Sequence, residues 1–257
     1  MTHSEKHCFA LYCPTLATHL EHLTRQNGIS LINPELWNRI TNILRLKHDD
    51  HFQLFDGNHC VTIQLDKQTF ATKKMIVGTV LEVVPLTPLT PTITVYQGLT
   101  KKEAFEDIVY AAAQLGVTHL QPIICDKTQR AWYGDKELIR VTSIMTAACE
   151  QSKQFALPSI QNPITFEQAL GQTQTKKPFA CAFETDGKKL SALLDIITAK
   201  PASSINLFIG PEGGFSDREL DLFNDHKVER YRLTPTVLRS QEAFLVGVGV
   251  LRSITAD

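Results

Sequence analysis

From residue 92 onward, short apolar runs alternate with longer amphipathic segments, and this alternation limits the possible folds more than any other feature. The apolar runs predict strands at residues 92–96, 119–124, 180–183, 205–209 and 228–233. The amphipathic segments predict helices at about 102–115, 136–152, 187–199, 216–224 and 240–253. Strands that alternate with helices in this way form a parallel sheet covered on both faces. The sequence therefore predicts an α/β domain in this region.

The preceding part of the chain has a different, β-rich pattern. The stretch HFQLFDGNHCVTIQLD (51–66) predicts a hairpin, because two apolar runs flank turn-forming residues at 56–58. One helix is expected at 34–46, and a further strand at 75–85. These elements predict a small β-barrel with a helix packed on it.

A proline-rich segment separates the two parts. PLTPLTPTI (85–93) holds three prolines, which is typical of a linker. The chain is therefore predicted to have two domains, at residues 1–85 and 86–257.

The charge balance limits the partners of the chain. Its 257 residues include 26 lysines and arginines against 27 acidic residues, for a net charge of −1. A nucleic-acid-binding surface would have to gather positive charge locally, because the total supplies no attraction. The six cysteines include no C-x-x-C pair, so we expect reduced core thiols rather than disulfides or a zinc site. No segment approaches a membrane span, which predicts a soluble, cytoplasmic protein.

The stretch FIGPEGGFSDREL (208–220) is the strongest candidate for a ligand site. Its three glycines permit positive φ and leave the backbone accessible to a ligand. Ser216 and Glu219 have the spacing of a capping box, so a helix is expected to offer its N-terminus there. Neither G-x-G-x-x-G nor a lysine after the glycines is present, which argues against a dinucleotide cradle and a P-loop. On shape alone, an ordinary strand-to-helix turn remains an equal alternative.

A second loop of the same kind occurs in YRLTPTVLRSQEAFLVGVGVL (231–251). A strand passes through a polar turn into an apolar helix that carries Gly247 and Gly249. Glycine inside a helix costs about 1 kcal/mol relative to alanine. The two glycines therefore indicate a close approach, either by a packed helix or by a partner subunit.

Taken in order along the chain, these motifs resemble the RsmE family of 16S ribosomal RNA uridine N3-methyltransferases. LFIGPEGGFSDREL and LTPTVLRSQEAFLVGVGVL are similar to the family's I-G-P-E-G-G-[LF]-S/T and L-G-x-R-[IV]-L-R-x-E-T-A runs. RLKHDDHFQLFDG, AAAQLGVTHLQPI and AACEQS are similar to its barrel, opening-helix and middle-helix signatures. The resemblance covers nearly the whole chain.

The resemblance implies a PUA-like RNA-binding β-barrel at 1–85 and a SPOUT-type α/β methyltransferase domain at 86–257, with a trefoil knot within about 180–257. It also implies that S-adenosylmethionine binds in the knot and that the enzyme is a homodimer with its sites at the dimer interface. Its substrate would be 16S rRNA, within the small ribosomal subunit, and no metal is implied. The implied cofactor-binding residues are Phe183, Glu184, Ile209, Gly210, Pro211, Gly213, Gly214, Leu233, Leu238 and Ser240.

The implied reaction moves a methyl group from a sulfonium to N3 of a uracil. That nitrogen carries a proton at neutral pH, so the site needs a base or a group that stabilises the uracil anion. Arg239 is the candidate partner of the anion or of an RNA phosphate, and Glu242 is the candidate proton acceptor. The alternative is a structural role in which Arg239 pairs with Glu242 or caps the end of a strand. His119 is expected to be structural.

Several charged positions of the family pattern are neutral in this chain, while the glycines of the cofactor loop are kept. The neutral replacements are Ala111, Gln114, Gln154, Thr236 and Gln241. Two alternatives therefore stay open. One is an RNA-binding protein of this fold with lost or altered methyltransferase activity. The other is an α/β enzyme that binds a different nucleotide through the glycine loop.

Overall fold

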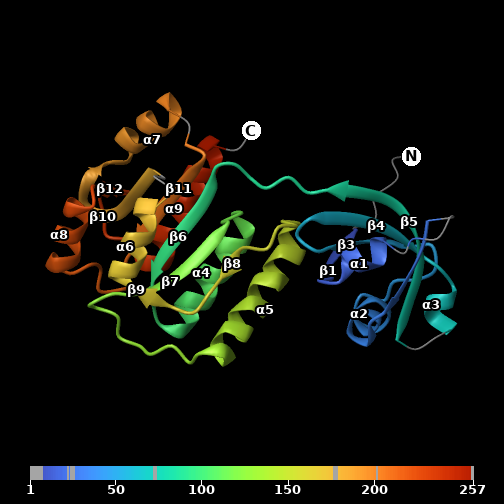
Figure 1. Cartoon of the computed structure of the whole chain (residues 1–257). Helices are drawn as coiled ribbons and strands as arrows, with labels where there is room; N and C mark the ends of the chain where they lie inside the picture. The colour runs from blue at the N-terminus through green and yellow to red at the C-terminus, as the bar shows by residue number, and fades with distance from the viewer. Residues whose placement is uncertain are drawn as a thin grey trace. The chain divides into compact units, whose positions relative to one another are not determined.

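Two structural units make up the chain. The computed structural model describes residues 8–21, 23, 27–71, 74–175, 179–200 and 202–255. One unit comprises residues 1–87 with 149–156, and the other comprises residues 88–148 with 157–257. Figure 1 shows the helices and strands of each unit.

The N-terminal unit is built on a mixed sheet with the strand order β1-β3-β4-β5-β2. Its strands are β1 (Phe9–Tyr12), β2 (Gly28–Ile32), β3 (His51–Phe55), β4 (His59–Leu65) and β5 (Met75–Pro85). The hairpin predicted at 51–66 is confirmed as the antiparallel pair β3–β4, with Gly57 at φ +97° in its turn. β1 pairs in parallel with β3. In the described part of the chain, β1 and β2 do not pair with each other, so closure of the sheet into a barrel stays a prediction.

The helix predicted at 34–46 is present in a shorter form. Asn33 caps its start, because its side chain accepts a hydrogen bond from Leu36 N at 3.0 Å. The α-helical part, α2 (Pro34–Asn38), passes directly into a π-helical turn, η1 (Arg39–Ile43). Hydrogen bonds in a π turn span five residues instead of four, so the regular helix ends there.

The core of this unit gathers side chains from all five strands and from the short helices. Besides α2, these are α1 (Leu16–Leu20) and the π-helical turn η1, whereas α3 (Gln68–Ala71) gives no side chain to this hydrophobic core. The buried core side chains include Leu11, Leu16, Ile29, Leu31, Leu36, Ile40, Phe52, Leu54, Val61, Ile63 and Ile76. The strands with one apolar face therefore pack as the alternating pattern predicts.

The C-terminal unit contains a parallel sheet with the strand order β12-β10-β11-β6-β7-β8, and β9 also pairs with β7. Its strands are β6 (Thr92–Gly98), β7 (His119–Ile124), β8 (Ser159–Ile160), β9 (Ile164–Thr165), β10 (Phe179–Lys189), β11 (Ser204–Ile209) and β12 (Glu229–Arg232). Every pairing in this sheet is parallel. The predicted parallel α/β architecture is confirmed.

Helices connect these strands. They are α4 (Lys102–Gln114), α5 (Asp135–Ser152), α6 (Phe166–Thr175), α7 (Leu190–Ala199), α8 (Asp217–Asp225) and α9 (Ser240–Thr255). The sequence did not predict α6. It also placed the start of α7 at 187, which is wrong, because β10 continues to Lys189 and pairs with β12 beyond a shift in register. No helix in the described residues is both long and apolar enough to cross a membrane.

Different helices pack on the two faces of the sheet. Phe166 of α6 and Phe223 of α8 contact Phe208 of β11, with ring centroids 6.1 Å and 5.2 Å from that of Phe208. Successive residues of a strand point to opposite faces, so Leu207 faces the other side. There α9 contacts β11, and α4 packs on α9. The sheet is thus covered on both sides, as expected for a parallel sheet.

The cysteines are free thiols, and most are buried. Cys13, Cys60, Cys125, Cys149 and Cys181 are all buried, and none of the described cysteines forms a disulfide. Burial raises the pKa of the Cys149 and Cys181 thiols to about 12. They are therefore protonated and unreactive near neutral pH, as the prediction of core thiols requires.

Candidate functional site

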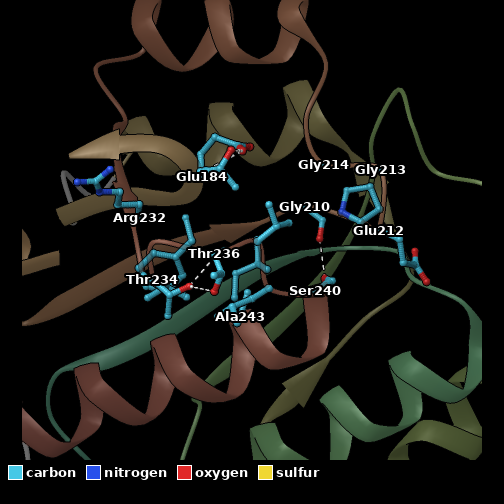
Figure 2. A pocket seen from close by; sticks show the side chains of 17 residues that line it. Glu184, Gly210, Glu212, Gly213, Gly214, Arg232, Thr234, Thr236, Ser240 and Ala243 are labelled. Carbon is cyan, nitrogen blue, oxygen red and sulfur yellow. Dashed lines mark hydrogen bonds between the residues drawn. The ribbon is translucent and has the colours of Figure 1, made fainter. Parts of the chain in front are cut away.

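Three chain segments meet where the parallel strands end and line a cavity of about 280 Å³ (Figure 2). They are residues 183–185, 209–214 and 232–243. Strand register brings them together, because Phe183 of β10 pairs with both Ile209 of β11 and Tyr231 of β12. All ten residues predicted to bind the cofactor lie in the lining: Phe183, Glu184, Ile209, Gly210, Pro211, Gly213, Gly214, Leu233, Leu238 and Ser240.

The glycine loop after β11 lies against the end of β6. Gly214 has φ +68°, a conformation that glycine adopts without strain, and its N–H donates to Pro211 O at 2.9 Å. A Cβ added to Gly98, the last residue of β6, would lie 2.4 Å from Pro211 N. A side chain at position 98 would therefore collide with the glycine loop, so this position requires glycine. The sequence alone did not indicate this requirement.

A buried glutamine joins the loop to two other elements. Gln97 of β6 is completely buried, and its Nε2 donates to Ser240 Oγ at 2.8 Å and to Gly98 O at 2.9 Å. Ser240 Oγ in turn donates to Gly210 O at 2.6 Å, the bond drawn in Figure 2. These hydrogen bonds link the end of β6, the glycine loop and the first residue of α9. Gln97 is thus a positioning residue that the sequence prediction missed.

The predicted capping box at the start of α8 is confirmed. Ser216 Oγ accepts a hydrogen bond from Glu219 N at 3.2 Å, and Glu219 Oε2 accepts one from Ser216 N at 2.8 Å. The second carboxylate oxygen of Glu219 accepts from Asp126 N at 2.9 Å, and the residue is fully buried. The box therefore also fastens the loop after β7 to the loop after β11.

Asp126 adds an ionic link at the same place. Arg218 donates to Asp126 Oδ1 at 2.7 Å and to Glu167 Oε1 at 2.6 Å, and Ser216 Oγ donates to Asp126 Oδ2. The hydrogen bonds from Arg218 and Ser216 lower the pKa of Asp126 to about 2. The carboxylate is therefore charged throughout the physiological range.

Lys127 supports the glycine loop from the outside. Its Nζ donates to Phe215 O at 2.8 Å. A Cβ added to Gly213 would lie 3.0 Å from the Cβ of Lys127. Gly213 is therefore confined between the cavity, which it lines, and this lysine.

Charged side chains also line the cavity. They include Glu184, Glu212 and Arg232, and Figure 2 shows Glu212 and Arg232 at opposite ends of it. Glu212 Oε1 accepts a hydrogen bond from Lys101 N at 2.7 Å, so its carboxylate is held against the start of α4. The sequence prediction omitted Arg232, and it did not name Glu212 individually, although Glu212 lies within the predicted glycine loop.

The two predicted catalytic residues lie beside the cavity and not in its lining. Arg239 directly precedes α9, Glu242 lies in its first turn, and both are exposed. Among the described residues they form no ion pair with each other, so the structural pairing that was considered as an alternative is not observed. His119, expected to be structural, has its Nδ1 2.6 Å from Ser159 Oγ.

Comparison with known proteins places the chain in a family. Residues 87–252 match the model of the RNA methyltransferase domain. A ribosomal RNA small subunit methyltransferase E of Synechocystis is 30% identical over 215 residues, which cover 82% of this chain and 69% of the relative. The chain belongs to the ribosomal RNA small subunit methyltransferase E family. Another member, from Rickettsia conorii, is 26% identical over 90% of this chain and 91% of its own length.

Solved structures of similar proteins extend over almost the whole chain. A methyltransferase structure from Legionella pneumophila with bound SAM has a TM-score of 0.80 at 25% identity, covering 98% of this chain and all of that one. The ribosomal RNA small subunit methyltransferase E of Neisseria gonorrhoeae, also solved with S-adenosyl methionine, has a TM-score of 0.81 at 23% identity, covering 96% and 98%. The fold of the present chain is therefore that of this family.

Proposed function

We propose that this protein uses S-adenosylmethionine to methylate N3 of a uridine in 16S ribosomal RNA, forming 3-methyluridine. The main observation behind the proposal is the cavity beside the register shift of β10 and the ends of β11 and β12, which is lined by every residue of the predicted cofactor set. Membership of the ribosomal RNA small subunit methyltransferase E family supports it independently.

The cavity suits the cofactor chemically. Gly210, Gly213 and Gly214 have no side chains, so their backbone groups are accessible to an adenine edge. The carboxylate of Glu184 lines the same cavity and would favour a cationic ligand. When bound, S-adenosylmethionine supplies a methyl group on a positively charged sulfonium. Gln97 and Ser240 would hold the loop in position around it.

The remaining chemistry concerns the proton on N3 of uracil. Arg239 is exposed and has no ion-pair partner in the described chain, so its guanidinium is available to a uracil anion or an RNA phosphate. Glu242 lies three residues further on, one helical turn away, where it would accept the proton. Neutralising the uracil anion would lower the barrier to methyl transfer.

A homodimer is part of the proposal. Val237 lines the cavity and yet is 81% exposed, and Leu245 and Val246 of α9 are 52% and 38% exposed. A second subunit packed on these apolar side chains would complete the cavity wall. Gly247 does not support the dimer, contrary to the sequence interpretation, because the Phe183 ring of the same chain occupies the space beside it.

The finer architecture is inferred from the family resemblance. We infer that the N-terminal unit is a PUA-like RNA-binding barrel and that the C-terminal unit is a SPOUT domain with a trefoil knot within about 180–257. The strand order, in which β10 lies between β11 and β12, also occurs in unknotted doubly wound sheets, so the knot is inferred from the family resemblance alone. A small-subunit RNA substrate would place the protein in the cytoplasm.

Two measurements test the function. Mass spectrometry of 16S rRNA nucleosides from a deletion strain should show loss of one 3-methyluridine, restored by the wild-type gene. Calorimetry should show S-adenosylmethionine binding by the purified protein. Cofactor binding without any change in the RNA would indicate a family member that binds RNA but has lost or altered the activity. Absence of cofactor binding would refute the site itself.

A further inference from the structure

A second cavity, of about 340 Å³, lies at the amino-terminal ends of the same strands. It is lined by Thr92 at the beginning of β6, whereas Gly98, at the other end of β6, lies beside the glycine loop. At about 3.3 Å per residue, these two ends of β6 are on the order of 20 Å apart. The second cavity is therefore separate from the cofactor site, and its occupancy does not depend on the proposed reaction.

The register of the strands gathers polar side chains on one face of the sheet here. Asn206 of β11 pairs with Thr94 of β6, Thr94 pairs with His119 of β7, and His119 pairs with Ser159 of β8. All four residues line the cavity. Parallel sheets normally carry apolar residues on both faces. His119 and Ser159 are exposed and contact each other, so the buried Asn206 is the unusual member of this row.

The next row of the same face shows where this polar region begins. Two residues further along the strands, Phe208 pairs with Tyr96, and Tyr96 pairs with Gln121. Phe208 and Tyr96 are stacked at 4.6 Å between ring centroids, and they belong to the aromatic core under α6 and α8, the helices seen in Figure 1. The cavity thus starts where the aromatic packing ends.

Two buried carboxamides border the cavity. Asn206 is only 7% exposed, and it lines the cavity. Gln121 is 9% exposed; its Nε2 donates to Pro122 O at 2.9 Å and to Asn162 O at 3.1 Å, which leaves its carbonyl oxygen without a described protein partner. In the described chain neither carboxamide has an atom that is both fully enclosed and unpaired, so their remaining polar atoms face the open cavity, where a bound molecule would reach them.

The composition of the wall defines the class of that molecule. No lysine, arginine, aspartate or glutamate is among the described residues that line it, which disfavours phosphates, carboxylates and metal cations. Leu120 is its only aliphatic lining residue in the described chain, which disfavours an apolar ligand. The wall does contain four carboxamides, from Gln121, Gln161, Gln172 and Asn206. A carboxamide places a donor beside an acceptor, the arrangement that pairs with the edge of a nucleobase.

We propose that this cavity binds an unpaired nucleobase, either of a free nucleoside or of one nucleotide in an RNA strand. The amide of Asn206 and the carbonyl oxygen of Gln121 contact the base edge, and the hydroxyls of Thr94 and Ser204 are placed to contact the ribose. Such a site would hold a second nucleotide at a distance from the reacting one.

Equilibrium dialysis of radiolabelled uridine, cytidine, adenosine and guanosine tests the proposal, with saturating S-adenosylmethionine present so that the first cavity is filled. We expect one-to-one binding of at least one nucleoside. Asn206→Leu should weaken that binding by about tenfold or more, as expected for loss of a paired donor and acceptor. Asn224→Leu, at an exposed position of α8, is the matched control and should bind like the wild type.

Gln121→Leu provides a second variant if Asn206→Leu does not fold, as judged by its melting temperature. Competition by a short single-stranded oligoribonucleotide would identify RNA as the source of the base, and lack of competition would identify free nucleosides. Absence of saturable binding for all four nucleosides would overturn the proposal. So would equal binding by the leucine variants, or binding of free ribose as tight as that of any nucleoside.

Discussion

The side-chain amide of Gln97 donates a hydrogen bond to Ser240 Oγ at 2.8 Å, across 143 positions of sequence. Ser240 Oγ in turn donates a hydrogen bond to Gly210 O at 2.6 Å. A single buried glutamine of β6 therefore fixes the loop and the helix that line the proposed cofactor cavity. Because these bonds are shielded from water, losing one leaves its partners unsatisfied.

Gln97→Leu should consequently lower both stability and cofactor affinity. We expect the free energy of unfolding to fall by about 1–3 kcal/mol, because Gly98 O and Ser240 Oγ lose their donor. Chemical denaturation and calorimetry with S-adenosylmethionine would measure the two effects. Gln161→Leu, an exposed glutamine of the second cavity, is the control and should leave cofactor affinity unchanged. Wild-type affinity in Gln97→Leu would show that the network does not position the loop.

Gly247 and Gly249 of α9 should respond oppositely to alanine. A Cβ on Gly247 would lie 2.0 Å from Cε2 of Phe183, whereas a Cβ on Gly249 would meet no heavy atom within 4 Å. Gly247→Ala should therefore destabilise the protein by about 1–3 kcal/mol through overpacking. Gly249→Ala should stabilise an isolated chain by up to about 1 kcal/mol, because alanine favours the helix.

Denaturation curves and sedimentation on both variants would separate packing from assembly. If Gly249→Ala instead destabilises and converts a dimer to a monomer, then Gly249 lies in the subunit interface. A stable Gly247→Ala variant would contradict the packing against Phe183.

The long elements of the fold could be predicted from the sequence, and the short ones could not. α4 and α5 each present a repeated apolar face over at least three turns, which makes their period clear. β8 and β9 have two residues each, too few to show any alternation. The start of α7 was misplaced because the pairing of Lys189 with Arg232 of β12, a tertiary contact, keeps that residue in a strand.

Gly213→Leu should weaken S-adenosylmethionine binding severely while the protein stays folded. The added side chain would meet Lys127, which is held by its bond to Phe215 O, so the loop would have to shift at the cavity wall. Calorimetry measures the affinity, and circular dichroism checks the fold. Gly171→Ala is the control, since its Cβ would meet nothing within 4 Å. Unchanged affinity in Gly213→Leu would remove the loop from the cofactor site.

The ionic link at Asp126 gives a pH-dependent contribution to stability. Arg218 and Ser216 lower its pKa to about 2, below the value of about 3.9 for an unfolded chain. The folded state therefore binds this proton less readily, and the contribution is fully present above about pH 5 and is lost as the pH falls toward 2. Because Asp126 and Arg218 are 38% and 52% exposed, water and salt screen the pair, and we expect its contribution to stability to be small.

Arg218→Ala tests this account. The difference in unfolding free energy between wild type and variant, measured by urea denaturation, should be constant from about pH 5 to 8 and should disappear at low pH. A difference that grows as the pH falls would contradict the assigned direction of the pKa shift.

The lining of the proposed cofactor cavity could be predicted because its residues lie in three short contiguous segments, at the register shift within β10, after β11 and after β12. Loops after parallel strands meet at one edge of the sheet. Residues that follow different strands in the sequence can therefore be expected to lie close together in space. Gln97 and Gly98 were not predicted, because they do not belong to any of these segments. They end a strand with no local motif of their own, and their importance depends on contacts with Ser240 and Pro211, far along the chain.

Arg239 offers the sharpest test of the catalytic proposal. It is exposed and forms no ion pair with described residues, so Arg239→Ala should leave the melting temperature and the affinity for S-adenosylmethionine nearly unchanged. If its guanidinium stabilises the uracil anion, methyl transfer should slow by roughly a hundred- to a thousand-fold, equivalent to about 2.7–4 kcal/mol in the barrier. Arg239→Lys should restore activity only in part, because lysine keeps the charge but lacks the planar fork. Transfer of a tritiated methyl group to small-subunit RNA measures the rate. Near-wild-type turnover in Arg239→Ala would exclude the catalytic role, and a reduced melting temperature with normal turnover would make the residue structural.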